Sequence, residues 1–258
     1  PTTRYPYGLK VFMRGGWGTN DLMLSFVNNH AVKATHFHYD ALSITAFAYG
    51  KFLLVDPGYG AILTGDTREY MMSPLNHNMV TVNDYKDWLN DGVLSSSKTL
   101  LQGDGKEVAF EGNLQYDFTE YSTTNYTTTE LSQRSVTFMR DDNFWIVTDY
   151  HIPNDTSVEN VYAQHWHFAP DSNFEYDSKY VLETNHDDVN IKVVPVEHTE
   201  IDSIKRVKTY YSETSGQLLN NEKAMIVKTK DGIGRFTTII VPENLGEDIS
   251  VETATFNT

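Results

Sequence analysis

Apolar and polar residues alternate along much of the first third of the chain, with the two-residue period of β-strands. The alternation predicts strands over residues 21–27, 43–50, 51–55 and 80–83. The step from Gly50 to Lys51 has the composition of a tight hairpin connection. We therefore expect the strands on either side of this step to pair in antiparallel fashion.

Two further hairpin signals follow later in the chain. Residues 135–140 and 144–150 flank a turn at 141–143, and residues 224–228 and 235–241 flank a glycine-containing turn at 231–234. Helical periodicity is weak, and no stretch rich in proline, glycine or serine divides the chain. These features predict one domain over residues 1–258, an all-β antiparallel multi-stranded β-sandwich of jelly-roll-like type.

Composition narrows the class of protein without naming a function. The 258 residues are 40% hydrophobic, enough for a sizeable core, and the formal net charge is −15. This charge argues against nucleic-acid binding, which needs a basic face. The absence of cysteine excludes disulfides and thiolate metal sites.

No apolar stretch approaches membrane-spanning length, so we expect no membrane partner. Because the first residues hold neither an initiator Met nor an apolar signal core, we interpret the chain as processed or cut from a longer protein.

Three ligand-type residues lie in or beside the predicted strands: His38, Asp56 and His77. Two imidazoles and a carboxylate are a good ligand set for zinc or a similar divalent ion. His36 and His38 would project from the same side of a strand, and the asparagines that flank His77 could orient its imidazole. Residue types alone leave an ordinary alternative open, in which Asp56 forms a turn before Pro-Gly and the histidines are structural.

The surroundings of these residues match a known pattern. Four segments, in order between residues 13 and 83, resemble the heparinase II/III family of polysaccharide lyases. They are Met13-Arg14-Gly15-Gly16-Trp17-Gly18, His36-Phe37-His38-Tyr39-Asp40-Ala41-Leu42-Ser43, Ala48-Tyr49-Gly50-Lys51-Phe52-Leu53-Leu54-Val55-Asp56-Pro57-Gly58 and Ser73-Pro74-Leu75-Asn76-His77-Asn78-Met79-Val80-Thr81-Val82-Asn83. The rest of the chain resembles the family only as a succession of strands.

The resemblance implies a C-terminal β-sandwich domain that follows an N-terminal α/α toroid, with substrate in the cleft between them. It implies a zinc ion, structural rather than catalytic, on His38, Asp56 and His77. It also implies that His36 faces the cleft and takes part in catalysis. Tyr59, directly after the Asp-Pro-Gly turn, lies where the loop could touch substrate, and packing over the turn is the ordinary alternative.

The implied reaction is β-elimination in polysaccharides that contain uronic acid, so the implied partner is an acidic polysaccharide or oligosaccharide. The chain would then hold one wall of the cleft and be inactive or nearly so by itself. A bacterial periplasmic or secreted location is expected. The alternative from another class is a non-catalytic, metal-stabilised carbohydrate-binding or interaction module.

Overall fold

The computed structural model describes residues 2–28, 38–58, 65–83, 104–124, 128–170, 172–214 and 217–252. The described part is mostly β-strand, as the alternating pattern predicts. Its elements are β1 (Thr3–Tyr5), η1 (Pro6–Gly8), β2 (Lys10–Arg14), β3 (Met23–Val27), β4 (Ser43–Ala48), β5 (Lys51–Leu54), α1 (Gly65–Met72), η2 (Pro74–Asn76), β6 (Val80–Val82), β7 (Asp104–Gly112), β8 (Tyr116–Thr124), β9 (Thr129–Met139), β10 (Phe144–Pro153), β11 (Glu159–His167), β12 (Phe174–Tyr176), β13 (Leu182–Thr184), β14 (Asn190–Pro195), η3 (His198–Glu200), β15 (Ser203–Tyr211), β16 (Leu219–Asp231) and β17 (Gly234–Glu243). No helix among them is long and apolar enough to cross a bilayer.

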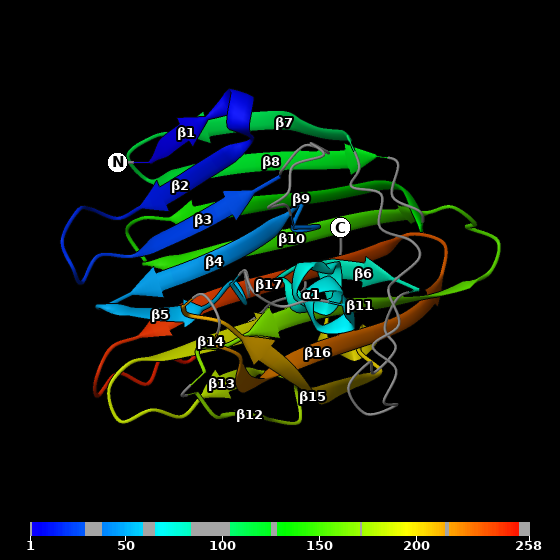
Figure 1. Ribbon diagram of the computed structural model, residues 1–258. Coiled ribbons are helices and arrows are strands. Elements are labelled where there is room, and N and C mark those ends of the chain that lie inside the picture. The colour runs from blue at the N-terminus through cyan, green and yellow to red at the C-terminus, as the bar shows by residue number, and fades with distance from the viewer. Residues whose placement is uncertain are drawn as a thin grey trace.

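The strands form three antiparallel sheets (Figure 1). One has the order β1-β2-β3-β4-β5, a second the order β12-β13-β14-β17-β10-β9-β8-β7, and a third the order β15-β16-β11-β6. An isolated bridge between Leu54 and Phe168 joins the edge of the five-stranded sheet to the end of β11. The predicted antiparallel β-sandwich is therefore confirmed.

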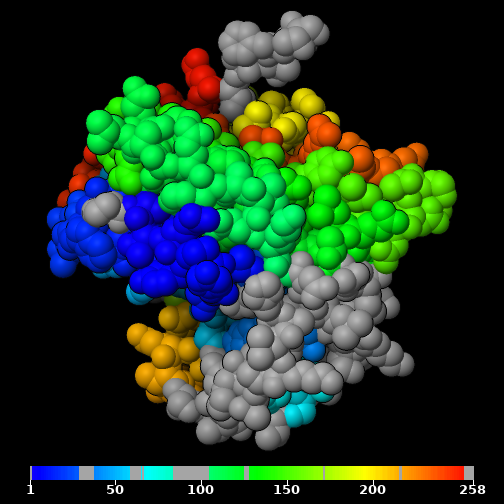
Figure 2. Space-filling view, turned by 90° about the horizontal axis from the view of Figure 1, so that it is seen from above, coloured from blue at the N-terminus to red at the C-terminus, as the bar shows by residue number. Residues whose placement is uncertain are grey.

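The larger of two hydrophobic clusters among the described residues lies between the sheets and draws on all three. Phe26 of β3 contacts Tyr121 of β8, with ring centroids 4.7 Å apart. Trp166 of β11 and Trp145 of β10 are both fully buried in the same cluster. The space-filling view from above shows the first strands, in blue, lying against the green strands of the eight-stranded sheet (Figure 2). Burial of one face accounts for the alternation of apolar and polar residues in strands such as β2, β3, β9 and β10.

Two of the three expected hairpins are confirmed. In the β4–β5 hairpin, Ala48 pairs with Lys51 across a turn formed by Tyr49 and Gly50. Both turn residues have positive φ, 50° and 87°, which is the geometry that matches the twist of the flanking strands. β9 and β10 pair around the turn at 140–143.

The expected hairpin at residues 231–234 is wrong. β16 pairs with β11 and β15, whereas β17 pairs with β10 and β14, so the chain changes sheets at this turn. The physical reason lies in packing: a Cβ at Gly234 would overlap the ring of Tyr162, so β17 begins pressed against β11 rather than beside β16. Local turn chemistry predicts a reversal of the chain, but it does not predict which strand becomes the partner.

Candidate metal site

His38, Asp56 and His77 come together in the structure. Each offers one ligand atom, and these three atoms all lie within 4.8 Å of one another. The His77 Nδ1 atom is 3.0 Å from the Asp56 Oδ2 atom, and the rings of His38 and His77 have centroids 5.2 Å apart. Two ligand atoms on one tetrahedral zinc ion lie about 3.3 Å apart. The separations and the donor types therefore fit a zinc or similar divalent ion.

The turn after β5 orients the carboxylate of Asp56. The Gly58 N–H donates a 3.0 Å hydrogen bond to Asp56 Oδ1, which leaves the other carboxylate oxygen directed at His77. Gly58 has a φ of +80°, and a Cβ there would overlap the carbonyl oxygen of Ser212. Ser212 in turn donates its N–H to the Pro57 carbonyl at 2.8 Å. Only glycine suits this position, because the backbone is left-handed and another chain segment approaches closely.

The side chain of Asn78 forms hydrogen bonds that link the three ligand-bearing segments. Its Nδ2 atom donates to the carbonyls of Ile44 and Val55, both at 2.9 Å, and its Oδ1 atom accepts the His167 N–H at 2.6 Å. Ile44 belongs to β4, which follows the His38 segment, and Val55 immediately precedes Asp56. One fully buried carboxamide thus connects the surroundings of all three ligands.

Arg134 supports the same region from the eight-stranded sheet. Its Nη1 atom donates to the carbonyls of Leu42 and Asn78, at 2.8 and 2.6 Å. Its Nε and Nη2 atoms pair with the Asp149 carboxylate, which also accepts a 3.0 Å bond from Gln164. Both charges of the pair are buried, and every contact is a charge-assisted hydrogen bond. No local sequence motif marks Arg134, but it points to the same buried side of β9 as Val136 and Phe138.

Electrostatics favour the protonation state that a metal ligand needs at His38 and Asp56, but not at His77. Burial lowers the pKa of His38, and the neighbouring His77 lowers it further. Burial by itself would raise the pKa of Asp56, but attraction and hydrogen bonding by His77 bring it below its ordinary value. Burial opposes protonation of His77 as well, yet the Asp56 carboxylate outweighs it and raises the His77 pKa. A bound cation would take the place of that His77 proton beside Asp56.

Two details of the sequence prediction are wrong. Residues 38–40 are not in a strand, because β4 begins at Ser43 after a turn in which Leu42 has a φ of 69°. The asparagines flanking His77 do not orient it, since Asn76 bonds Thr209 and Met71, and Asn78 bonds the backbone of other strands. Asp56 fulfils that role through His77 Nδ1.

Other candidates have different outcomes. His36 and Tyr59 lie outside the described residues, so the structure says nothing of either. His165 and His167, which also have His-x-His spacing, are fully buried on β11. Burial holds the pKa of both well below the ordinary value, and neither joins a metal-ligand group in the part of the chain that the structure describes.

Comparison with known families decides what kind of domain carries this site. The model of the heparinase II/III-like C-terminal family matches residues 8–250. The chain belongs to the heparinase II/III-like family. No curated protein matches it by sequence.

Solved structures share the fold of this heparinase II/III-like domain. Heparan sulfate lyase HepC from Pedobacter heparinus has a TM-score of 0.78 and 18% identity, over 93% of this chain and 36% of that one. The heparinase III BT4657 gene product has a TM-score of 0.78 and 15% identity, over 95% of this chain and 36% of that one. A further heparinase III structure has a TM-score of 0.73 and 14% identity, over 93% and 36%. The chain therefore spans about a third of the length of these proteins.

Proposed function

We propose that this chain is the C-terminal domain of a polysaccharide lyase that cleaves uronic-acid-containing polysaccharides by β-elimination. It would carry a zinc site and one wall of the substrate cleft. The observation that supports the proposal is the convergence of His38, Asp56 and His77 within a heparinase II/III-like fold. A second domain, an N-terminal α/α toroid in the same protein, would supply the other wall.

The reaction requires a base, an acid and stabilisation of developing charge. Removal of the C5 proton, α to the uronate carboxylate, leads to a C4–C5 double bond as the C4–O bond breaks, and the leaving oxygen takes up a proton. In this proposal His36 donates that proton or a hydrogen bond from the sandwich side, because an imidazole titrates near neutral pH. Tyr59 would contact substrate from the loop after Gly58. The remaining acid–base groups would come from the toroid.

The metal would act mainly as a support in this proposal. His38, Asp56 and His77 would hold it, and the ion would supply a fixed positive charge that joins the His38 segment, the Asp56 turn and the His77 loop. The domain would work in the periplasm or outside a bacterial cell, where polymeric substrates are available.

Metal content tests the site directly. Elemental analysis of the purified chain should find about one divalent ion per molecule, and His38→Ala and His77→Ala should each lose it. Lys106→Ala, an exposed residue on β7, is the matched control and should keep the ion. Equal metal content in all four proteins would refute the site.

The activity test needs a protein that includes both walls of the cleft. Uronic-acid polymers should yield an unsaturated product, whose formation is monitored by its ultraviolet absorbance. His36→Ala should reduce the rate of product formation by about 100-fold or more. Absence of product from every uronate polymer would contradict the lyase proposal. Binding of polysaccharide without product would instead favour a carbohydrate-binding module.

A further inference from the structure

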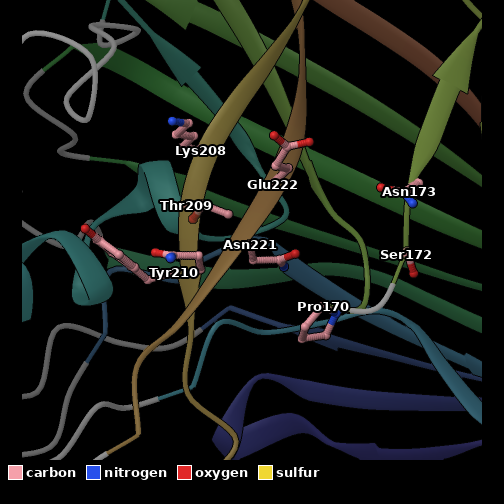
Figure 3. Close-up of a pocket in the computed structure, with 9 residues that line it drawn as sticks. Pro170, Ser172, Asn173, Lys208, Thr209, Tyr210, Asn221 and Glu222 are labelled. Carbon is pink, nitrogen blue, oxygen red and sulfur yellow. The ribbon is translucent and has the colours of Figure 1, made fainter.

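A cavity of about 360 Å³ with a mixed polar and apolar lining lies on the four-stranded sheet. It opens between the β15–β16 pair and the segment that follows β11 (Figure 3). Its lining includes Ser172, Asn173, Lys208, Tyr210, Asn220 and Glu222. Carboxamides and hydroxyls predominate, and these groups both donate and accept hydrogen bonds. Sugar hydroxyls have the same dual capacity, so these side chains match a carbohydrate.

Two buried residues make part of the lining rigid. The Asn221 Nδ2 atom donates to the Phe168 carbonyl at 3.0 Å, which fixes the carboxamide plane. The Thr209 hydroxyl is held between Tyr70, which donates to it at 3.1 Å, and the Asn76 carboxamide. Polar groups held in this way need little reordering when a ligand binds, which lowers the entropic cost of association.

The charge of the cavity differs from that of the whole chain. Glu222 is engaged by Arg206, with Nη1 and Oε2 3.0 Å apart. Among the described residues, no carboxylate lies within ion-pairing distance of Lys208, although the molecule carries a formal net charge of −15. Glu222 lies opposite Lys208 in the β15–β16 register and is paired with Arg206, so Lys208 is the charged lining residue left to pair with a ligand that combines hydroxyls with one negative charge.

The cavity and the metal site share structural support. Asn76, which bonds Thr209 of the cavity, directly precedes the metal-ligand residue His77. The rings of Tyr70 and Tyr210 meet edge to face with centroids 6.2 Å apart. The segment from Tyr70 to His77 therefore contacts both places, so a polymer crossing this face could reach the two together.

We propose that this cavity binds one anionic sugar residue of a polysaccharide, with the carboxylate or sulfate of that residue paired to Lys208. The choice of a polysaccharide as ligand rests on the proposed function. The lining of the sugar-binding position includes none of the three metal ligands.

Calorimetric titration of the 258-residue chain tests the proposal with three oligosaccharides of equal length: an unsulfated uronate-containing one, a sulfated one and a neutral one. We expect binding of one or both anionic oligosaccharides, and binding of the neutral one at least about tenfold weaker. Lys208→Glu should weaken anionic binding by about tenfold or more, while Lys208→Arg should keep it within about threefold. Lys106→Glu, on distant β7, makes the same change in net charge and should bind like the wild type.

The outcomes separate this proposal from the lyase proposal. Equal binding by the Lys208→Glu and Lys106→Glu proteins would overturn the cavity assignment, and so would a wild type that binds none of the three sugars. Equal affinity for neutral and anionic sugars would overturn the role of Lys208. None of these results bears on the formation of unsaturated product, which tests the lyase reaction independently. Side-chain amide NMR signals of Asn173, Asn220 and Asn221 should shift on binding, which locates the sugar.

Discussion

At the scale of single residues, the site depends on side chains whose ligand atoms are already directed at one another. Asp56 is partly exposed, yet one of its oxygens is held by Gly58 and the other by His77. His77 is fully buried, and its Nε2 atom has no hydrogen-bond partner among the residues that the structure describes. Backbone turns and burial thus help to set the positions of these side chains.

Gly58→Ala should destabilise the protein and impair the site. The left-handed backbone costs about 1–2 kcal/mol for a residue with a Cβ, and the overlap with the Ser212 carbonyl should raise the total to about 3 kcal/mol or more. Gly246→Ala is the matched control, because its φ is similar, +78°, and no atom lies within 4 Å of its Cβ. Urea unfolding and metal analysis of both variants check this. Equal losses of stability would show that the Ser212 contact is unimportant.

His151 provides a pH-dependent contribution at the same scale. It is fully buried on β10, with Nδ1 3.0 Å from the Ser132 hydroxyl, and burial lowers its pKa to about 4. The unfolded chain binds a proton there near pH 6.5, whereas the folded chain does not until about pH 4. Stability therefore falls as the pH falls through this window, because the unfolded state binds more protons.

His151→Gln should make the protein less sensitive to acid. Between pH 7 and pH 5 the wild type should lose about 2 kcal/mol more of its free energy of unfolding than the variant. His198→Gln, at the surface helix η3, serves as the control. Urea unfolding at the two pH values measures the difference, and identical pH dependence of wild type and His151→Gln would contradict the assignment.

At the scale of elements, buried polar side chains add to the few backbone contacts that join the sheets. Arg134 and Asp149 lie on β9 and β10, and the arginine reaches the carbonyls of Leu42 and Asn78 beyond its own sheet. Gln164 of β11 bonds both Asp149 and Thr238 of β17. The layers are therefore held in one register relative to each other, and the metal ligands lie where they meet.

Arg134→Met should cost about 3–5 kcal/mol of stability, because it leaves the Asp149 charge and two carbonyls buried without their partner. The exposed pair of Lys51 and Asp188 offers a control, with 39% and 47% of the side chains accessible. Lys51→Met should change stability by no more than about 1 kcal/mol. Chemical denaturation compares the two. A small effect of Arg134→Met would mean that water satisfies the groups it leaves behind.

At the scale of the whole molecule, the proposed metal site links segments that are distant along the chain. His38 precedes β4, Asp56 follows β5 and His77 follows η2. The Asp56 turn also contacts Ser212, just after the end of β15. An ion that binds the folded state alone shifts the unfolding equilibrium of every element that packs on these segments.

Metal removal should therefore lower the melting temperature of the whole chain. At a free metal concentration about 1,000 times Kd, binding contributes about 4 kcal/mol, so a chelator should lower the melting temperature by about 10 °C. Calorimetry with and without chelator measures this shift. The His77→Ala protein should melt at one temperature in both conditions, and an equal response of wild type and variant would contradict a specific site.

Part of this architecture could be predicted because it is local. The alternation of residues 43–48 and 51–54 determines two strands, and Tyr49-Gly50 needs no distant contact to form its turn. The order of the His38, Asp56 and His77 motifs indicated the ligand set through resemblance to a family. The helix α1 was not predicted, because it spans only Gly65–Met72 and is too short to show a clear helical periodicity of apolar residues.

By itself, the sequence determined the strand-rich class, the antiparallel hairpins with short turns and the three residues of the candidate metal site. Only the tertiary structure decided the sheet to which β17 belongs, the partners of Arg134 and Asn78, and the cavity beside Lys208. The physical reason is the range of the interactions. Turn geometry and periodicity act between neighbours in the chain, whereas buried hydrogen bonds and cavities arise where segments far apart in sequence pack together.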